Sequence, residues 1–140
     1  MANRKKVPRI QEPINDNSQV FKWAIDGSCA NFTSEYFGLT CCFQDGTFVN
    51  CILPQLNQYS QKTWAEIQQN KHNHSFDITE ITNNELQNIY IKLEIETAYQ
   101  LCVPLDKSKH RIWGKREGPV FYLIANDPEH IGYPTSKKHT

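Results

Sequence analysis

The stretch around residues 110–130 constrains the fold of this chain more than any other part. It reads as two β-strands, 109–116 and 120–126, joined by a turn at Gly118-Pro119. Glycine can adopt a positive φ and proline has a fixed φ, so a chain reversal at this pair has a physical basis. The first strand is basic and the second is almost wholly apolar, which predicts a hairpin with one buried strand. Pro128 ends the second strand because proline cannot donate to a sheet ladder.

Further strands are predicted on either side of the chain centre. Residues 97–103 form a strand before the hairpin, and Asp106-Lys107-Ser108 supplies the reversal, so three strands make an antiparallel meander. Near the N-terminus, residues 20–25 have aromatic and β-branched side chains at the density of a strand and end at a turn. Residues 36–43 read as a second strand. The connection between these two is too long to decide whether they pair.

Capping patterns predict helices between the strands. Thr63 with Glu66, and Thr82 with Glu85, each place a hydroxyl and a carboxylate three residues apart, which is the pattern of a capping box. Apolar residues recur at helical spacing after the second box, which predicts a helix over 83–93.

The remaining central segments are less regular. Residues 48–59 also show helical spacing, but Pro54 requires a helix to begin or bend there. Residues 70–77 read as a polar loop. The fold class is therefore α+β, with one or two N-terminal strands, two to three helices packed on one face of the sheet, and the three-stranded antiparallel meander.

The chain of 140 residues is long enough for one domain. We expect a flexible basic arm over 1–17, a single α+β domain over 18–134 and a basic tail over 135–140. The hydrophobic fraction of 39% and the charged fraction of 21% are typical of a globular protein. No apolar run reaches the roughly 20 residues needed to cross a bilayer. The basic N-terminus is not followed by an apolar segment, so we expect a cytoplasmic protein without a membrane partner.

The five cysteines do not predict a disulfide framework or a zinc site. Their number is odd, no C-x-x-C pair occurs, and Cys41 and Cys42 are adjacent. His72 and His74 are two residues apart and could chelate a metal only with further ligands from elsewhere in the fold. We therefore expect no metal and no cofactor, with the histidines in an exposed loop.

The net charge is zero, but the charges are unevenly distributed. Residues 77–96 are acidic, and residues 107–116 are basic. This asymmetry can create a local basic patch. The alternative is that the acidic helix pairs with the basic hairpin.

The hairpin and its end carry the candidate site. His130 could transfer a proton near neutral pH, and guanidinium groups match phosphate oxygens. We predict catalytic roles for His130, Arg111 and Arg116. We predict phosphate binding by Lys115 and Lys109, and base stacking by Trp113. The alternatives are that Arg111 pairs with a helix glutamate, that His130 caps the sheet, and that Trp113 packs beneath the N-terminal arm.

These residues also carry a resemblance. The run 111–118, followed by Phe121-Tyr122 and by Asp127-Pro128-Glu129-His130, resembles a group of small bacterial proteins that share R-I-[WY]-G-x-R-x-G and F-Y-x-x-x-x-D-P-x-H segments. Residues 62–67 are similar to the M-T-W-x-E-I pattern of that group, with lysine in place of methionine. This resemblance implies no particular activity.

More distantly, the order of strand, helices and basic meander is similar to the RelE/ParE toxin architecture. That resemblance implies cleavage of ribosome-bound messenger RNA or action on gyrase, a cognate antitoxin, and a bacterial or mobile-element origin. By position in the chain, it implies that the active residues are Arg111, Arg116 and His130. This chain departs from the pattern because it is longer, neutral and has a second predicted N-terminal strand.

Two functions follow as hypotheses. The first is a toxin-like RNA-binding protein or metal-independent ribonuclease that acts through the basic β-hairpin, with RNA, the ribosome or an antitoxin as partners. The second is a non-catalytic protein-protein interaction module that uses a sheet edge or a helical face. A concave, exposed cluster of Arg111, Trp113, Lys115 and His130 would favour the first. Burial of Trp113, with the basic residues paired to helix glutamates, would favour the second. The sequence leaves the oligomeric state open.

Overall fold

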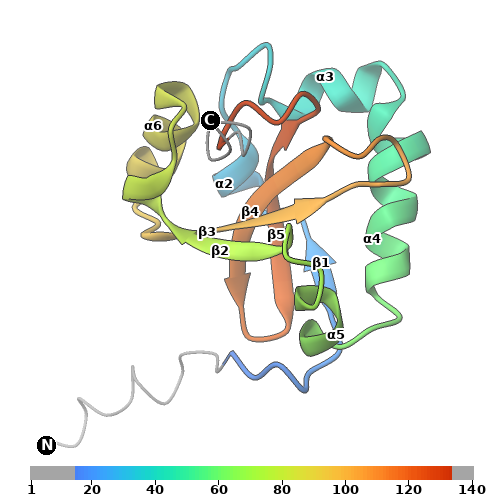
Figure 1. The fold of residues 1–140 in the computed structure, drawn as a ribbon. Coiled ribbons are helices and arrows are strands. Elements are labelled where there is room, and N and C mark those ends of the chain that lie inside the picture. The colour runs from blue at the N-terminus through green and yellow to red at the C-terminus, as the bar shows by residue number, and fades with distance from the viewer. Residues whose placement is uncertain (1–14, 134–140) are drawn as a thin grey trace, which may run out of the picture.

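The protein is an α+β domain built on one five-stranded mixed sheet (Figure 1). The computed structural model describes residues 15–133. The strand order is β1-β5-β4-β3-β2, in which β1 pairs in parallel with β5 and all other pairs are antiparallel. The strands are β1 Lys22–Ala24, β2 His74–Asp77, β3 Thr97–Cys102, β4 Arg111–Glu117 and β5 Val120–Asp127. The predicted N-terminal strand and the C-terminal meander are confirmed.

The helices lie between β1 and β3 along the chain. They are α2 Gly27–Ala30, α3 Leu39–Gln44, α4 Leu53–Tyr59, α5 Trp64–Gln68 and α6 Asn84–Lys92, with a π-helical turn at Phe48–Ile52 and a 3-10 turn at Ile78–Glu80. The capping box at Thr63 forms as predicted and begins α5. Asn83 rather than Thr82 caps α6, since its side chain accepts from the Leu86 amide. Pro54 lies in the first turn of α4, directly after the π-helical turn.

Two local predictions are wrong. Residues 36–43, predicted as a strand, instead lead into α3, because Leu39 and Cys42 face the core at helical spacing while Cys41 is exposed. The predicted polar loop over 70–77 ends in β2, which pairs antiparallel with β3 and buries Phe76. The free edge of β3 thus gains hydrogen-bond partners that local sequence patterns do not predict.

Helices cover both faces of the sheet, which corrects the expectation that they pack on one face. One core cluster joins α3, α4 and α5 to side chains such as Ile112 and Leu123. A second cluster joins α2 and α6 to Trp113 and Ile124 on the opposite face. Alternate residues of β4 therefore enter different cores, and little of the central strands remains for solvent.

The ends of the predicted domain also need adjustment. Residues 15–17, expected within a flexible arm, are held against the β4–β5 turn, where the Gly118 amide donates to the Asn15 side chain at 2.8 Å. Most of that arm, and the whole predicted basic tail over 135–140, lie outside the described residues. Within residues 15–133, none of the helices has the length and apolar character required to cross a membrane.

Candidate functional site

The candidate residues of the basic hairpin do not form the concave, exposed cluster that would favour an RNA-binding surface, because Arg111, Trp113 and His130 are buried. Trp113 is fully buried, and its indole N–H donates to the Asp127 carboxylate at 3.1 Å. Its ring packs 5.5 Å from that of Phe76. A base needs an exposed ring face to stack on, so stacking on Trp113 would require this part of the core to open.

Arg116 has a structural environment. Its Nε donates to the Gly118 carbonyl at 2.8 Å, and its two terminal nitrogens donate to Asn17 Oδ1 at 2.7 Å and to the Asp16 carbonyl at 3.0 Å. The guanidinium also lies 4.1 Å from the centre of the Trp64 ring. With these contacts made, Arg116 fixes the N-terminal segment and lies on the opposite face of β4 from Arg111.

The two predicted phosphate-binding lysines form ion pairs. Lys115 pairs with Glu117 at 3.0 Å, and Lys109 pairs with Glu129 at 2.6 Å. Lys109 and Lys107 hold the pKa of Glu129 down to about 2. The partners of Lys109 and Lys115 are thus neighbouring strand and loop residues rather than glutamates of α6, so the expected pairing of the hairpin with the acidic helix is not observed for them.

Arg111 differs from Arg116 because part of its guanidinium has no partner. Its side chain is 3% exposed, and one terminal nitrogen donates to the carbonyls of Ser108 at 2.6 Å and His110 at 3.1 Å. Its Nε is buried and makes no hydrogen bond. Burial lowers the pKa of Arg111 but leaves it a cation at neutral pH. The chemistry of this unused donor suits an anion, but the donor is enclosed by the fold, so an anion would reach it only if neighbouring side chains moved.

The charge of Arg111 acts on His130, which also has a ring nitrogen without a hydrogen-bond partner. The residue adopts a left-handed conformation with φ of 59°, and its buried Nε2 has no hydrogen-bond partner. Burial lowers its pKa, and the positive charge of Arg111 lowers it further. The imidazole is therefore mostly neutral near pH 7. A non-glycine residue in this conformation costs roughly 1–3 kcal/mol, and such strain is concentrated at functional sites.

Asp127 creates the loop that carries His130. Its carboxylate is fully buried and accepts four hydrogen bonds, from Tyr36, Trp113 and the amides of residues 131 and 132, at 2.7–3.1 Å. Asp127 thus positions His130 through the backbone of the loop.

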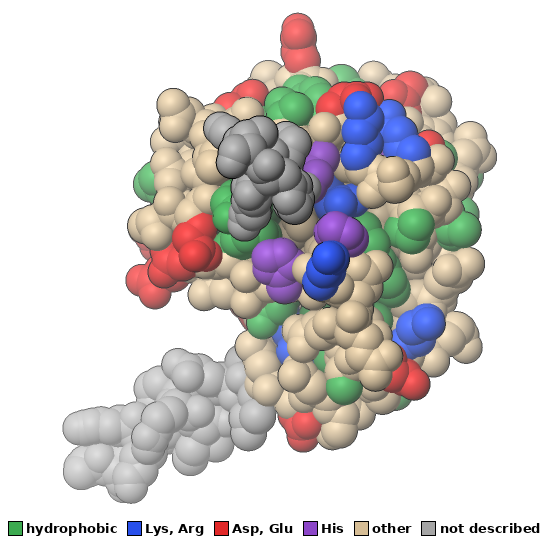
Figure 2. Space-filling view, in the orientation of Figure 1, with side chains coloured by type: hydrophobic (Ala, Val, Ile, Leu, Met, Phe, Trp, Pro, Cys, Tyr) green, Lys and Arg blue, Asp and Glu red, His purple; other side chains and the backbone are tan. Residues whose placement is uncertain are grey.

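His72 is the member of the site that the sequence did not predict. It is half-buried just before β2, and its carbonyl accepts a hydrogen bond from the Gln100 side chain at 3.0 Å. Burial and the charge of Arg111 lower its pKa, and its own charge opposes protonation of His130. His72, Arg111 and His130 are therefore within electrostatic reach of one another. Figure 2 shows histidine side chains gathered with lysine and arginine side chains on one face of the molecule.

Strand register brings the segments that carry His72, Arg111 and His130 to one end of the sheet. Arg111 lies opposite Cys102 of β3 on one side and Asp127 of β5 on the other, so their side chains share a face at one end of the sheet. The only sequence signal for His72 was that it and His74 point to the same side of an extended segment.

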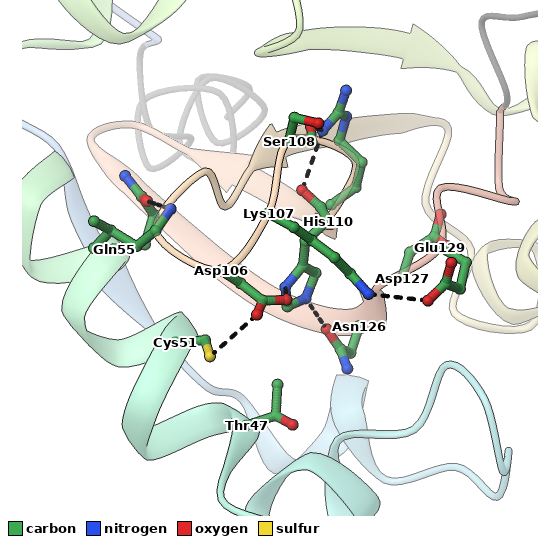
Figure 3. Close-up of polar contacts among 12 residues, drawn as sticks. Thr47, Cys51, Gln55, Asp106, Lys107, Ser108, His110, Asn126, Asp127 and Glu129 are labelled. Carbon is green, nitrogen blue, oxygen red and sulfur yellow. Dashed lines mark hydrogen bonds and ion pairs between the residues drawn. The ribbon is translucent and has the colours of Figure 1, made fainter.

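A second polar cluster lies on the other side of β4 (Figure 3). His110 is fully buried, with Nδ1 2.9 Å from Asp106 Oδ2 and Nε2 2.5 Å from Asn126 Oδ1. The Cys51 thiol lies 3.6 Å from the other Asp106 oxygen. Burial and the Asp106 carboxylate raise the pKa of Cys51, so the thiol stays protonated. Both imidazole nitrogens are occupied, and the cluster ties the β3–β4 loop to the π-helical turn and β5.

Among residues 15–133, no group of three or more histidine, cysteine, aspartate or glutamate side chains is arranged to hold a metal ion. The pair His72 and His74 has no third ligand of that kind in this part of the chain.

Comparison with models of known families, with curated proteins and with solved structures finds no match to this chain. The resemblances to the small bacterial proteins and to the RelE/ParE toxins therefore stay predictions.

Proposed function

We propose that this protein is a toxin-like, metal-independent ribonuclease that binds an RNA phosphate between Arg111 and His130. The supporting observation is the pair of buried, unpartnered nitrogens, Arg111 Nε and His130 Nε2. Leaving a buried polar atom unpaired costs about 1–3 kcal/mol. We infer that a ligand completes their hydrogen bonds, and because both nitrogens are buried it would reach them only if the surrounding side chains moved apart.

A phosphodiester of RNA suits this site chemically. Arg111 would donate to a non-bridging oxygen and stabilise the charge that develops on phosphorus oxygens. The neutral Nε2 of His130 would accept the proton of the adjacent 2′-hydroxyl as its oxygen bonds to phosphorus. As the bond from phosphorus to the 5′-oxygen breaks, protonated His72 would give that oxygen a proton. The products would be a 2′,3′-cyclic phosphate and a 5′-hydroxyl end.

Cleavage of a labelled RNA oligonucleotide by the purified protein in a chelating buffer tests the proposal. We expect His130→Ala and Arg111→Lys each to lower the rate by about 100-fold or more, because each removes a group used in the transition state. Lys22→Gln is the control, since Lys22 is an exposed cation of β1 that has no role in the proposed site. Thermal unfolding must show that all variants are folded.

The same variants can be compared in a bacterial host. Induced wild-type protein should arrest growth with loss of bulk RNA, and both site substitutions should relieve the arrest at equal soluble protein. Intact RNA in the presence of soluble wild-type protein, in the host and in the purified assay, would contradict the ribonuclease. Arrest with intact RNA would direct attention to a protein target.

A further inference from the structure

Gln100 carries the third buried polar atom without a partner. The residue is 1% exposed in β3, between His74 of β2 and Trp113 of β4. Its Nε2 donates to the His72 carbonyl, while its Oε1 makes no hydrogen bond. Rotating the amide would set oxygen against oxygen and leave the nitrogen unpaired instead. The unused group is therefore an acceptor.

This acceptor belongs to the same face of the β3–β4 ladder as Arg111, whose Nε donor is also unused. Gln100 pairs with Trp113 and Cys102 pairs with Arg111, so Gln100 and Arg111 are diagonal neighbours on one face of the β3–β4 ladder. Diagonal neighbours are roughly 7–8 Å apart and within reach of long side chains. A ligand that satisfies both must offer an anionic oxygen and, close to it, a hydrogen-bond donor.

We propose that Gln100 Oε1 accepts a hydrogen bond from a ribose 2′-hydroxyl and thereby makes the site select RNA over DNA. The inference rests on the proposed function, because it requires a phosphate at Arg111. The hydroxyl concerned belongs to the nucleotide on the 3′ side of that phosphate, since the hydroxyl on the 5′ side gives its proton to His130. Deoxyribose has no donor at this position, so the buried oxygen would stay unpaired.

Binding of oligonucleotides that cannot be cleaved tests this role directly. The nucleotide on the 5′ side carries a 2′-O-methyl group, which blocks the reaction, and the nucleotide on the 3′ side is either ribose or deoxyribose. We expect wild-type protein to bind the ribose form about tenfold more tightly, the scale expected for one buried hydrogen bond. Gln100→Met has a similar length but no acceptor, and should bind both forms equally.

Gln55→Met is the matched control. Gln55 is also buried, but its Oε1 already accepts from the Leu105 amide at 3.1 Å, so its loss should leave the ribose preference intact. Because the ratio of the two affinities is measured within each variant, general effects on folding or on His72 cancel.

The outcomes separate the two proposals. Equal binding of both forms by wild-type protein, or an unchanged preference in Gln100→Met, would overturn the role of Gln100. Ribose preference that depends on Gln100, without cleavage of the unblocked oligonucleotide, would support that role and overturn the ribonuclease. No binding of either form would overturn both.

Discussion

At the scale of single residues, unmet hydrogen bonds separate the two arginines of β4. Arg116 donates from all three of its nitrogens to the N-terminal segment and the hairpin turn. Arg111 keeps a buried Nε without an acceptor, and His130 has a buried, unpaired Nε2. From the sequence, Arg111 and Arg116 were equivalent candidates for a catalytic role, because both are arginines of the same predicted strand. Their hydrogen bonds differ, and the proposal rests on Arg111 because only its Nε is left without a partner.

The titration of His130 should depend on Arg111. Its pKa is lowered by burial and by the positive charge of Arg111, so Arg111→Gln should raise that pKa toward the ordinary value of about 6.5. Histidine signals followed by NMR across pH 4–9 (roughly the range that brackets this titration) would measure the change. Lys71→Gln is the control, because Lys71 affects the pKa of His72 and is not among the charges that act on His130. An unchanged His130 titration in Arg111→Gln would contradict the predicted coupling.

The pH dependence of cleavage follows from the same two histidines. Burial and Arg111 lower the pKa of both His72 and His130, so protonated and neutral imidazole coexist only on the acidic side of the ordinary histidine pKa. We therefore expect a bell-shaped rate profile with its optimum below about pH 6.5. An optimum above pH 8 (about 1.5 units above the ordinary imidazole pKa) would be inconsistent with a pair of imidazoles moving the protons.

Asp127→Asn should destabilise the protein through the loop that carries His130. An amide nitrogen cannot accept the bonds that one carboxylate oxygen now receives from Trp113 and from the amide of residue 132. We expect a loss of about 3 kcal/mol in the free energy of unfolding, measured by urea denaturation. Asp26→Asn, a change at a partly exposed helix cap where asparagine also functions, should leave the denaturation midpoint nearly unchanged. Equal effects of the two changes would contradict the structural role of Asp127.

At the scale of elements, the β4–β5 hairpin depends on close backbone approach at Gly114. The register of this pair shifts between Trp113 and Gly114, and a side chain at Gly114 would collide with the Tyr122 carbonyl and the Phe121 ring. The Gly114 carbonyl also accepts from the Tyr90 hydroxyl of α6 at 2.7 Å. Gly114 thus lets the hairpin and α6 pack together, which gives a physical reason for a glycine at this point of the motif.

Gly114→Ala should therefore disrupt the hairpin. We expect a loss of more than about 2 kcal/mol in stability, or no soluble protein, because the colliding Tyr122 carbonyl belongs to the sheet ladder and cannot move freely. In Gly27→Ala, the new methyl group would meet nothing within 4 Å. The melting temperature of this variant should therefore match or slightly exceed that of the wild-type protein. Similar melting temperatures for the two variants would argue against a tight hairpin.

At the scale of the whole molecule, the sheet is enclosed by helices and the candidate site lies at one end of it. The N-terminal segment closes the opposite end of the hairpin, where Arg116 and Gly118 bind residues 15–17. The contacts of Arg116 thus lie at the other end of β4 from the candidate site. A substitution of Arg116 should therefore leave the proposed RNA cleavage intact.

Arg116→Lys tests this separation. Lysine cannot reproduce the forked hydrogen bonds of Arg116 or its stacking on Trp64. We expect about 2 kcal/mol lower stability, with unchanged RNA cleavage at a temperature where the variant is folded. Arg111→Lys should show the opposite result, with a large loss of cleavage and a smaller loss of stability. Abolished cleavage in folded Arg116→Lys would return Arg116 to the catalytic role that its sequence position first indicated.

Local patterns predicted the elements whose formation depends on near neighbours. The Thr63 capping box, the helix over 84–92 and the hairpin turned at Gly118 all form from residues within one element or one turn of each other. Residues 36–43 have side chains compatible with a strand, and only contact with the core selected a helix there. β2 exists because β3 offers it a partner.

The sequence by itself determined the α+β class, the C-terminal meander and the presence of Arg111 and His130 near its end. Only the tertiary structure decided that Trp113 is buried, that Arg116 binds the N-terminal segment, and that Gln100 shares a face of the sheet with Arg111, within electrostatic reach of His72. The physical reason is that side-chain chemistry and period-two alternation are local, whereas hydrogen-bond partners and burial are set by strand register and by helices from distant parts of the chain.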